Sequence, residues 1–354
     1  MSRAGITMVT GFVASIIIIM LAATGHAAES LIPREMVYIA HGPSVMGIDK
    51  DEPADSGKRL TAYEKRMKTP WSAEALNDEG PAHMVFLDSY LMDKYEVSNK
   101  EYGEFVKAKG HPAPAYWDDP RLNKPEHPVV GVNWEDAKAF CEYRGKRLPT
   151  EAEWEKAARG PKANLYPWGN EFDPANVNYG KNHDATMPVD AYPEGVSYYG
   201  VYNMAGNVFE WVSDWYDPRY YGRLETMVNP AGPAKPLWLG GTGTYVDRLT
   251  VGEKRVIRGG SWIAPESTVR ATHRFWNHPL NNSYGVGLGF RCAKTAPPEI
   301  EQRIRDASIS VMVEMGHERF ADAEQAVLRG LAIDPKNVEL LELKSLIESS
   351  MKRP

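Results

Sequence analysis

Cysteine is scarce in this chain of 354 residues, which contains only Cys141 and Cys292. A site that uses two thiolates, whether for a metal or for redox chemistry, would have to use both of them. Clusters of basic residues are also missing: the formal net charge is −6, and Lys and Arg are scattered along the chain. The electrostatic footprint of a nucleic-acid-binding protein is therefore absent, and we expect no nucleic-acid partner.

Several catalytic motifs are absent too. The sequence has no phosphate-binding glycine loop, no Gly-x-Ser-x-Gly nucleophile turn and no His-Glu-x-x-His helix. These absences disfavour nucleotide-dependent enzymes, α/β-hydrolases and zinc proteases of the usual types.

Long apolar runs are confined to the N-terminus. Arg3 precedes an apolar stretch from about Phe12 to Ala23, and Gly25 and Ala27 suit the −3 and −1 positions of a cleavage site. We predict a signal peptide over residues 1–28 and a periplasmic or secreted protein. The alternative is an uncleaved N-terminal anchor, in which case the membrane becomes a partner.

Two cysteines in an exported protein are expected to pair. A Cys141–Cys292 bridge would close a loop of about 150 residues and could stabilise the fold by on the order of 5 kcal/mol. The alternative is two free thiols in the core.

Glycine and proline are plentiful, at 30 and 26 residues, which indicates an ordered domain of turns and short elements. We expect one main domain over residues 29–296, with strands at 35–40 and 83–93. Two charged or irregular segments, near 48–80 and 218–254, are expected to be surface insertions.

Three helices are predicted from their end signals. Ser98 with Glu101 and Thr150 with Glu153 form capping-box patterns, before helices that end at Gly110 and Gly160. Asn133 can cap a third helix, which reaches Gly145 and carries Trp134, Ala137 and Cys141 on one face.

Pro297-Pro298 marks a boundary, and we expect residues 297–354 to form a separate helical tail. Phe320, Ala323 and Pro335 have the spacing of a partial tetratricopeptide repeat, but one repeat cannot form a solenoid. The alternative is a helical hairpin that packs on the main domain or on a partner. We expect residues 299–350 to offer a surface for a protein or peptide.

Five phrases occur in a distinctive order: Arg147–Glu155, Tyr166-Pro-Trp-Gly169, Gly206–Trp211, Arg258-Gly-Gly-Ser-Trp262 and Gly289–Cys292. With them, the region from about Met36 to Lys294 resembles the formylglycine-generating enzyme (sulfatase-modifying factor) family. The resemblance implies a C-type-lectin-like α+β fold with little regular secondary structure. It also implies a structural disulfide between Cys141 and Cys292.

Calcium is a second implication of the resemblance. The family binds it with oxygen ligands from a loop, and these map onto Asn203, Gly206, Val208 and Glu210, where Gly206 and Val208 contribute carbonyls. A second family site maps onto Asn176 and Val177, with Asp184 a less secure match. The alternative at each place is an ordinary loop held by hydrogen bonds.

The family's oxidation chemistry is not implied as readily. Active members use two redox cysteines that bind copper, and these positions are Ala264 and Val269 here. Neither side chain supplies a thiolate, so we expect no copper and no formylglycine generation by this route.

Other polar residues follow the Gly-Gly-Ser phrase and are candidates for a groove. They could bind an anion or transfer protons, and they are Ser261, Glu266, Arg270, His273 and Arg274. In the alternative interpretation, Arg258, Arg274 and Arg291 form core ion pairs and the histidines lie on the surface.

Two functions remain open. The first is a calcium-stabilised binding or accessory module, a pseudoenzyme that keeps the scaffold without the cysteine chemistry. The second is an oxidative tailoring enzyme that modifies proteins or peptides through a site without cysteines. Fold resemblance alone does not choose between them.

Overall fold

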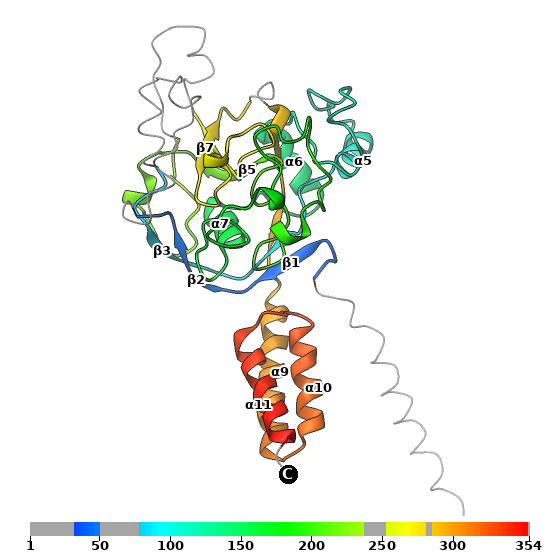
Figure 1. Cartoon of the computed structure of the whole chain (residues 1–354), viewed down its shortest axis with the longest axis vertical. Coiled ribbons are helices and arrows are strands. Elements are labelled where there is room, and N and C mark those ends of the chain that lie inside the picture. The colour runs from blue at the N-terminus through cyan, green and yellow to red at the C-terminus, as the bar shows by residue number, and fades with distance from the viewer. Residues whose placement is uncertain (1–31, 50–77, 237–252, 281–284, 353–354) are drawn as a thin grey trace, which may run out of the picture.

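The computed structural model describes residues 32–49, 78–236, 253–280 and 285–352 (Figure 1). The predicted signal peptide lies outside the described residues, as do the central parts of both predicted insertions. Within the described ranges, no helix is long and apolar enough to cross a membrane.

Three small sheets form the main domain, which is a mixed α and β fold with short elements, as expected. One sheet has the order β1-β4-β9 and a second pairs β2 with β3, while the largest has the order β7-β6-β5-β8. Among the strand pairs of the described residues, only β5 and β8 run parallel. The strands are β1 (Met36–Ile39), β2 (Gly42–Met46), β3 (His83–Leu87), β4 (Tyr90–Asp93), β5 (Phe209–Trp215), β6 (Arg255–Arg258), β7 (Arg274–Asn277), β8 (Leu288–Phe290) and β9 (Ala293–Thr295).

The single strand predicted over residues 83–93 is wrong, because β3 and β4 belong to different sheets. The extended strand is interrupted at Asp88, which is bound by Asn229. The Asp88 amide donates to Asn229 Oδ1, and Asn229 Nδ2 donates to the Asp88 carboxylate, both at 2.8 Å. This clamp comes from residues 141 positions apart, so local periodicity could not reveal it.

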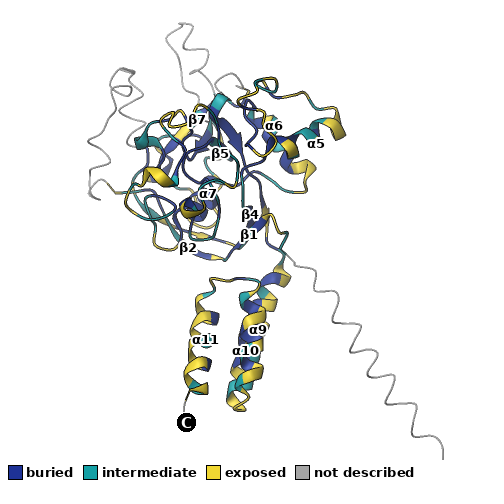
Figure 2. Ribbon diagram, turned by 45° about the vertical axis from the view of Figure 1, so that its right-hand side comes forward, coloured by how far each residue is buried: buried dark blue, intermediate teal, exposed yellow. Residues whose placement is uncertain are grey.

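The three helices predicted from capping signals are confirmed as α5 (Asn99–Lys109), α6 (Trp134–Tyr143) and α7 (Glu151–Arg159). Each begins with a capping box, in which the N-cap side chain and the third helical residue satisfy each other's backbone N–H groups. Every residue of α7 is buried, and it packs against β2 and β5. Figure 2 shows the contrast with α5, which has an exposed face.

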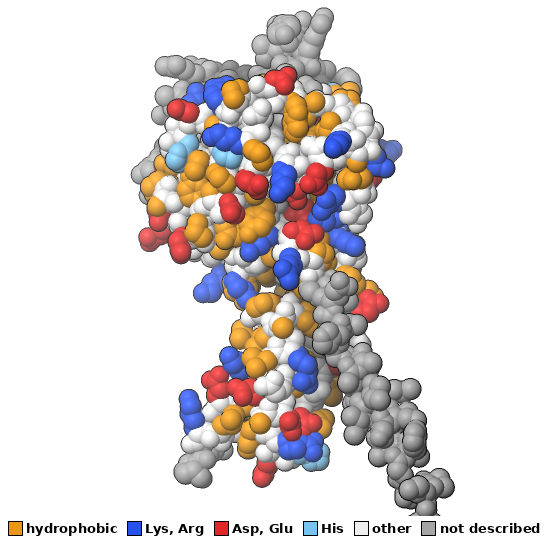
Figure 3. Space-filling model, turned by 90° about the vertical axis from the view of Figure 1, so that its right-hand side faces the viewer, with side chains coloured by type: hydrophobic (Ala, Val, Ile, Leu, Met, Phe, Trp, Pro, Cys, Tyr) orange, Lys and Arg blue, Asp and Glu red, His pale blue; other side chains and the backbone are white. Residues whose placement is uncertain are grey.

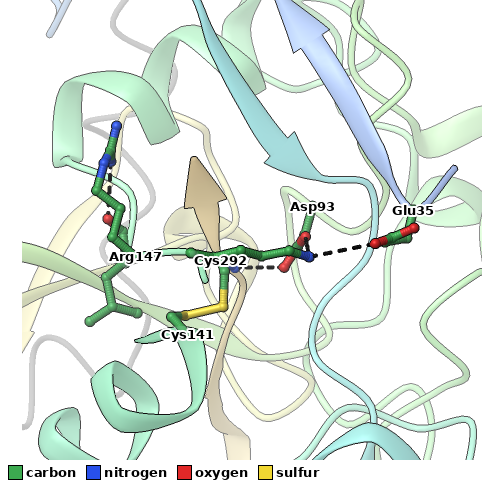
Figure 4. Close-up of a disulfide and its surroundings, with 7 residues drawn as sticks. Glu35, Asp93, Cys141, Arg147 and Cys292 are labelled. Atoms are coloured by element: carbon green, nitrogen blue, oxygen red, sulfur yellow. Dashed lines mark hydrogen bonds and ion pairs between the residues drawn. A yellow bond between two sulfur atoms is a disulfide. The ribbon is translucent and has the colours of Figure 1, made fainter. Parts of the chain in front are cut away.

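The expected disulfide between Cys141 and Cys292 is present, and it joins α6 to the residue before β9. Figure 4 shows its surroundings. The Cys292 amide donates to one oxygen of Asp93 at 3.0 Å, while Lys146 donates to the other at 2.6 Å. The bridge and this buried ion pair together fix the end of β4 against the core.

Both predicted insertions contain core residues at their ends, which corrects their description as surface segments. Asp78 and Glu79 are buried, and their side chains bond with Tyr216 and Arg270. Tyr220 and Tyr221 are buried too, and the Tyr221 hydroxyl donates to Glu155. Charged and turn-rich composition suggested solvent, but these groups find partners from distant elements.

The tail has three helices rather than the two of a hairpin: α9 (Pro298–Gly316), α10 (Phe320–Leu331) and α11 (Val338–Met351). They extend from the domain below β1 (Figure 1). Ile300 and Ile304 of α9 share an apolar cluster with Met36 and Tyr38 of β1, so the tail is packed on the main domain. Figure 3 shows hydrophobic, acidic and basic side chains mixed on one face of these helices.

Candidate functional site

Ala264 and Val269, the two positions that the resemblance matches to redox cysteines, lie on either side of a short 3-10 helix, Glu266–Thr268. Ala264 is 7% exposed and Val269 is fully buried. Val269 packs with Val177 and Ala205 in a small apolar cluster. Apolar side chains therefore occupy the places where thiolates would be needed, and both cysteines of the chain are used in the disulfide. The residues present do not fit copper.

A tight glycine turn leads into this segment. Gly260 has φ +75°, and a Cβ atom there would lie 2.8 Å from the Thr268 carbonyl oxygen. Glycine is thus required for the chain to fold back on itself. The next residue, Ser261, is buried, and its hydroxyl has no hydrogen-bond partner. Glu266, the last groove candidate of this turn, is half-buried.

Arg270 and His273 are buried and share one acidic partner that the sequence analysis missed. Arg270 donates to Glu79 Oε1 at 2.6 Å, and His273 Nδ1 lies 3.3 Å from the same oxygen. Burial would raise the pKa of Glu79, but Arg270, helped by His273 and Thr272, lowers it to about 2. Burial lowers the pKa of His273 despite this partner. The expectation that the histidines lie on the surface is therefore wrong for His273.

Arg274 and Arg258 form a buried ion-pair network with α7. Arg274 donates to both carboxylate oxygens of Glu151, at 2.8 and 2.9 Å. Arg258 bridges Glu151 and Glu155, at 3.1 and 2.6 Å. These contacts confirm the alternative interpretation in which the arginines pair in the core, and they occupy both terminal nitrogens of Arg258, whose Nε alone is left without a partner. The guanidinium groups hold α7 against β6 and β7.

The loop predicted to bind calcium precedes and enters β5. Asn203, Gly206 and Asn207 have positive φ angles of 52°, 72° and 60°. A Cβ at Gly206 would lie 2.3 Å from the Asn178 carbonyl oxygen, so glycine is required there. Val208 and Glu210 are fully buried. The four predicted ligands therefore all belong to one buried segment, which runs from Asn203 in the loop to Glu210 in β5.

Glu210 is paired within the protein. Arg291 donates to its two oxygens at 2.6 and 2.7 Å, and Trp154 Nε1 donates at 2.8 Å. A second carboxylate, Glu96, reaches the same loop: Asn203 Nδ2 donates to Glu96 Oε2 at 2.9 Å. Glu96 was missed by the sequence analysis, although a lone acid between Tyr95 and Val97 is the kind of residue that could have indicated a buried site.

The second predicted calcium site is less well assembled. Asn182 Nδ2 donates to the Val177 carbonyl at 3.1 Å, so a different side chain from Asp184 reaches that oxygen. Asp184 is exposed, and Asn176 makes a long contact of 3.5 Å with Asp173. In the part of the chain that the structure describes, no three His, Cys, Asp or Glu side chains gather into a metal-binding group. A site here would depend mainly on amide and carbonyl oxygens.

Comparison with known proteins assigns the main domain. A family model described as the sulfatase-modifying factor enzyme 1-like domain matches residues 23–296. The formylglycine-generating enzyme of Thermomonospora curvata is 36% identical over 61% of this chain and 85% of its own. The mouse protein named inactive C-alpha-formylglycine-generating enzyme 2 is 30% identical over 77% of this chain and 88% of its own length.

Other similarities extend the picture of the fold. Serine/threonine-protein kinase pkn1 of Chlamydia caviae is 36% identical over 63% of this chain, but the match spans only 36% of that kinase. The solved structure of PvdO from Pseudomonas aeruginosa superposes with a TM-score of 0.55 and 25% identity, covering 73% of this chain and 94% of PvdO. The chain therefore belongs to the sulfatase-modifying factor family of formylglycine-generating-enzyme-like proteins.

Proposed function

We propose that this chain is an exported, calcium-stabilised binding or accessory module that does not generate formylglycine with copper and cysteine. One observation carries the proposal: Ala264 and Val269 are buried apolar residues, while Cys141 and Cys292 are joined to each other. Copper-dependent oxidation of a substrate cysteine needs thiolate ligands for Cu(I). Forming such a site from Cys141 and Cys292 would require breaking the bridge that joins α6 to β9.

Calcium would be held by Asn203, the carbonyls of Gly206 and Val208, and Glu210. Hard oxygen ligands of this kind suit Ca²⁺. An unpartnered buried oxygen next to the loop, Glu96 Oε1, supports the fit, because a cation would satisfy it. Bound calcium would stabilise the loop that leads into β5 and, through it, the main domain.

The tail is the surface that we propose for a protein or peptide partner. Its helices carry exposed apolar side chains on α9, including Ile309 and Met312, and on α11, including Leu341 and Leu346. Apolar groups that protrude among charges of both signs suit a protein surface of similar mixed character.

An oxidative tailoring enzyme is the second candidate. It is favoured by two buried polar atoms without partners in the segment that follows the Gly-Gly-Ser phrase, Ser261 Oγ and His273 Nε2. Unsatisfied groups of this kind can mark a reaction site. In this case the chemistry would have to proceed without a cysteine pair.

Metal analysis combined with oxygen uptake separates the two candidates. For a binding module, the purified protein contains calcium and no stoichiometric copper or iron, and it consumes no oxygen when offered cysteine-containing peptides. Stoichiometric redox metal together with peptide-dependent oxygen uptake would overturn the binding-module proposal in favour of the enzyme.

A further inference from the structure

The Glu96 carboxylate is buried in the loop between β4 and α5, with 1% of the residue exposed. One of its oxygens, Oε2, accepts hydrogen bonds from Asn203 Nδ2 at 2.9 Å and Asn207 Nδ2 at 3.0 Å. The other oxygen, Oε1, is buried and has no partner. A buried carboxylate oxygen without a donor is costly, so its place beside this loop calls for an explanation.

The charges of the described residues in this region favour the binding of a cation. Two carboxylates border the loop: Glu96 accepts from Asn203 and Asn207, and Glu210 lies just after the loop in β5. Arg291 is the cation that faces both of them, and its donors are committed to the two oxygens of Glu210 and to backbone carbonyls. Of the other charges nearby, Asp93 is paired with Lys146, and Lys94 lies over the rings of Tyr95 and Tyr202. Two buried carboxylates thus share one guanidinium.

The amides that bind Glu96 also orient the loop. Asn203 and Asn207 both adopt left-handed backbone conformations and turn their Nδ2 groups toward the same oxygen of Glu96. Asn207 Oδ1 accepts from the Met187 amide at 2.8 Å, so the Asn207 side chain is fixed on both sides. Glu96 is therefore held in place by the predicted calcium loop, while its second oxygen remains available.

We propose that Glu96 is a further ligand of the calcium site formed by Asn203, Gly206, Val208 and Glu210, and that it presents Oε1 to the cation. This inference rests on the proposed calcium site and goes beyond the ligands expected from the family. A second carboxylate would raise the negative charge of the site, which is one way in which proteins increase calcium affinity. The bound cation would in turn offset the negative charge of Glu96 and Glu210.

Glu96→Gln tests the proposal, because it keeps the size of the side chain and one oxygen to accept from Asn203 and Asn207, while it removes the charge and replaces the second oxygen by an NH2 group. The measurements are calcium titration by calorimetry, and thermal unfolding with excess calcium or with a chelator. We expect the variant to bind calcium about tenfold more weakly than the natural protein, or weaker still. In the chelator it should be at least as stable as the natural protein, because the repulsion with Glu210 is gone.

Asp214→Asn is the matched control, since Asp214 is also a buried carboxylate but accepts from the Glu151 amide and Ser213 instead of the loop. Its calcium affinity should equal that of the natural protein. Should Glu96→Gln fail to fold, Glu96→Asp keeps the charge but shortens the reach, and we expect it to bind calcium more weakly as well.

The outcomes separate this inference from the function on which it rests. Unchanged calcium affinity in Glu96→Gln, or in Glu96→Asp if that is the variant measured, overturns the role of Glu96 while leaving the calcium site in place. Equal destabilisation of Glu96→Gln with calcium and with chelator, again with unchanged affinity, would assign Glu96 a purely structural role. If the natural protein neither binds calcium nor gains stability from it, the calcium site itself is refuted.

Discussion

Arg270 donates a hydrogen bond of 2.6 Å to the carboxylate of Glu79, which lies 191 positions earlier in the chain. Arg270 directly follows Val269, one of the two positions where active family members carry a redox cysteine. The segment that would hold copper in those members is thus anchored here by a buried ion pair. The contact therefore fixes this segment to the residues around Glu79.

Breaking that ion pair should destabilise the protein strongly. Glu79→Gln leaves the Arg270 charge buried without its counterion, so we expect the free energy of unfolding to fall by about 3–5 kcal/mol. Urea denaturation measures this change. Asp119→Asn is the control, because it disrupts the exposed pair with Arg121 and should have no measurable effect. Equal effects of the two variants would show that burial does not strengthen the Glu79 contact.

The disulfide should be complete in the protein purified without a reducing agent. Thiol alkylation under denaturing, non-reducing conditions should label neither Cys141 nor Cys292, because the two are joined. Replacing both by alanine is expected to lower the free energy of unfolding by about 2–5 kcal/mol. Labelling of both cysteines before reduction would contradict the bridge.

Asp214 should make stability depend on pH. Burial, with Glu151 nearby, raises the pKa of Asp214 from 3.8 to about 7. The folded protein then keeps a proton that the unfolded chain releases, so this residue's contribution to stability falls as pH rises from about 4 to about 7. Asp214→Asn removes that dependence. Chemical denaturation at pH 5 and pH 8 should show that the variant gains stability relative to the natural protein at the higher pH, and an equal difference at both would refute the shift.

Packing of the tail on the main domain can be tested with two isoleucines of α9. Ile300 is fully buried in the cluster shared with β1, whereas Ile309 is 53% exposed. Ile300→Ala should lower the free energy of unfolding by about 2–5 kcal/mol, and Ile309→Ala should change it by less than about 0.5 kcal/mol. Comparable small effects would mean that the tail does not stabilise the domain.

Local signals predicted the helices well. In the pairs Ser98–Glu101 and Thr150–Glu153, each side chain accepts a hydrogen bond from the other residue's backbone N–H. Such a capping box depends only on residues three positions apart, so the sequence reveals it directly. The ordered motifs predicted the family and the disulfide, because the full set rarely occurs outside one fold.

The buried polar contacts could not be predicted in this way. Glu79 pairs with Arg270 and His273 across almost two hundred residues, and its position in a charged, turn-rich segment suggested solvent. The break between β3 and β4 likewise depends on Asn229, far along the chain. Tertiary packing determines which of these residues meet, so local periodicity and composition cannot predict the contacts.

The most direct test of the central claim is the conversion of a substrate cysteine. The purified protein, loaded with Cu(I) and supplied with oxygen, is incubated with a cysteine-containing sulfatase peptide, and the peptide mass is measured. The formylglycine-generating enzyme of Thermomonospora curvata, a relative of this chain, serves as the positive control. Because Ala264 and Val269 supply no thiolates, we predict an unchanged peptide; a peptide carrying the aldehyde would contradict the account.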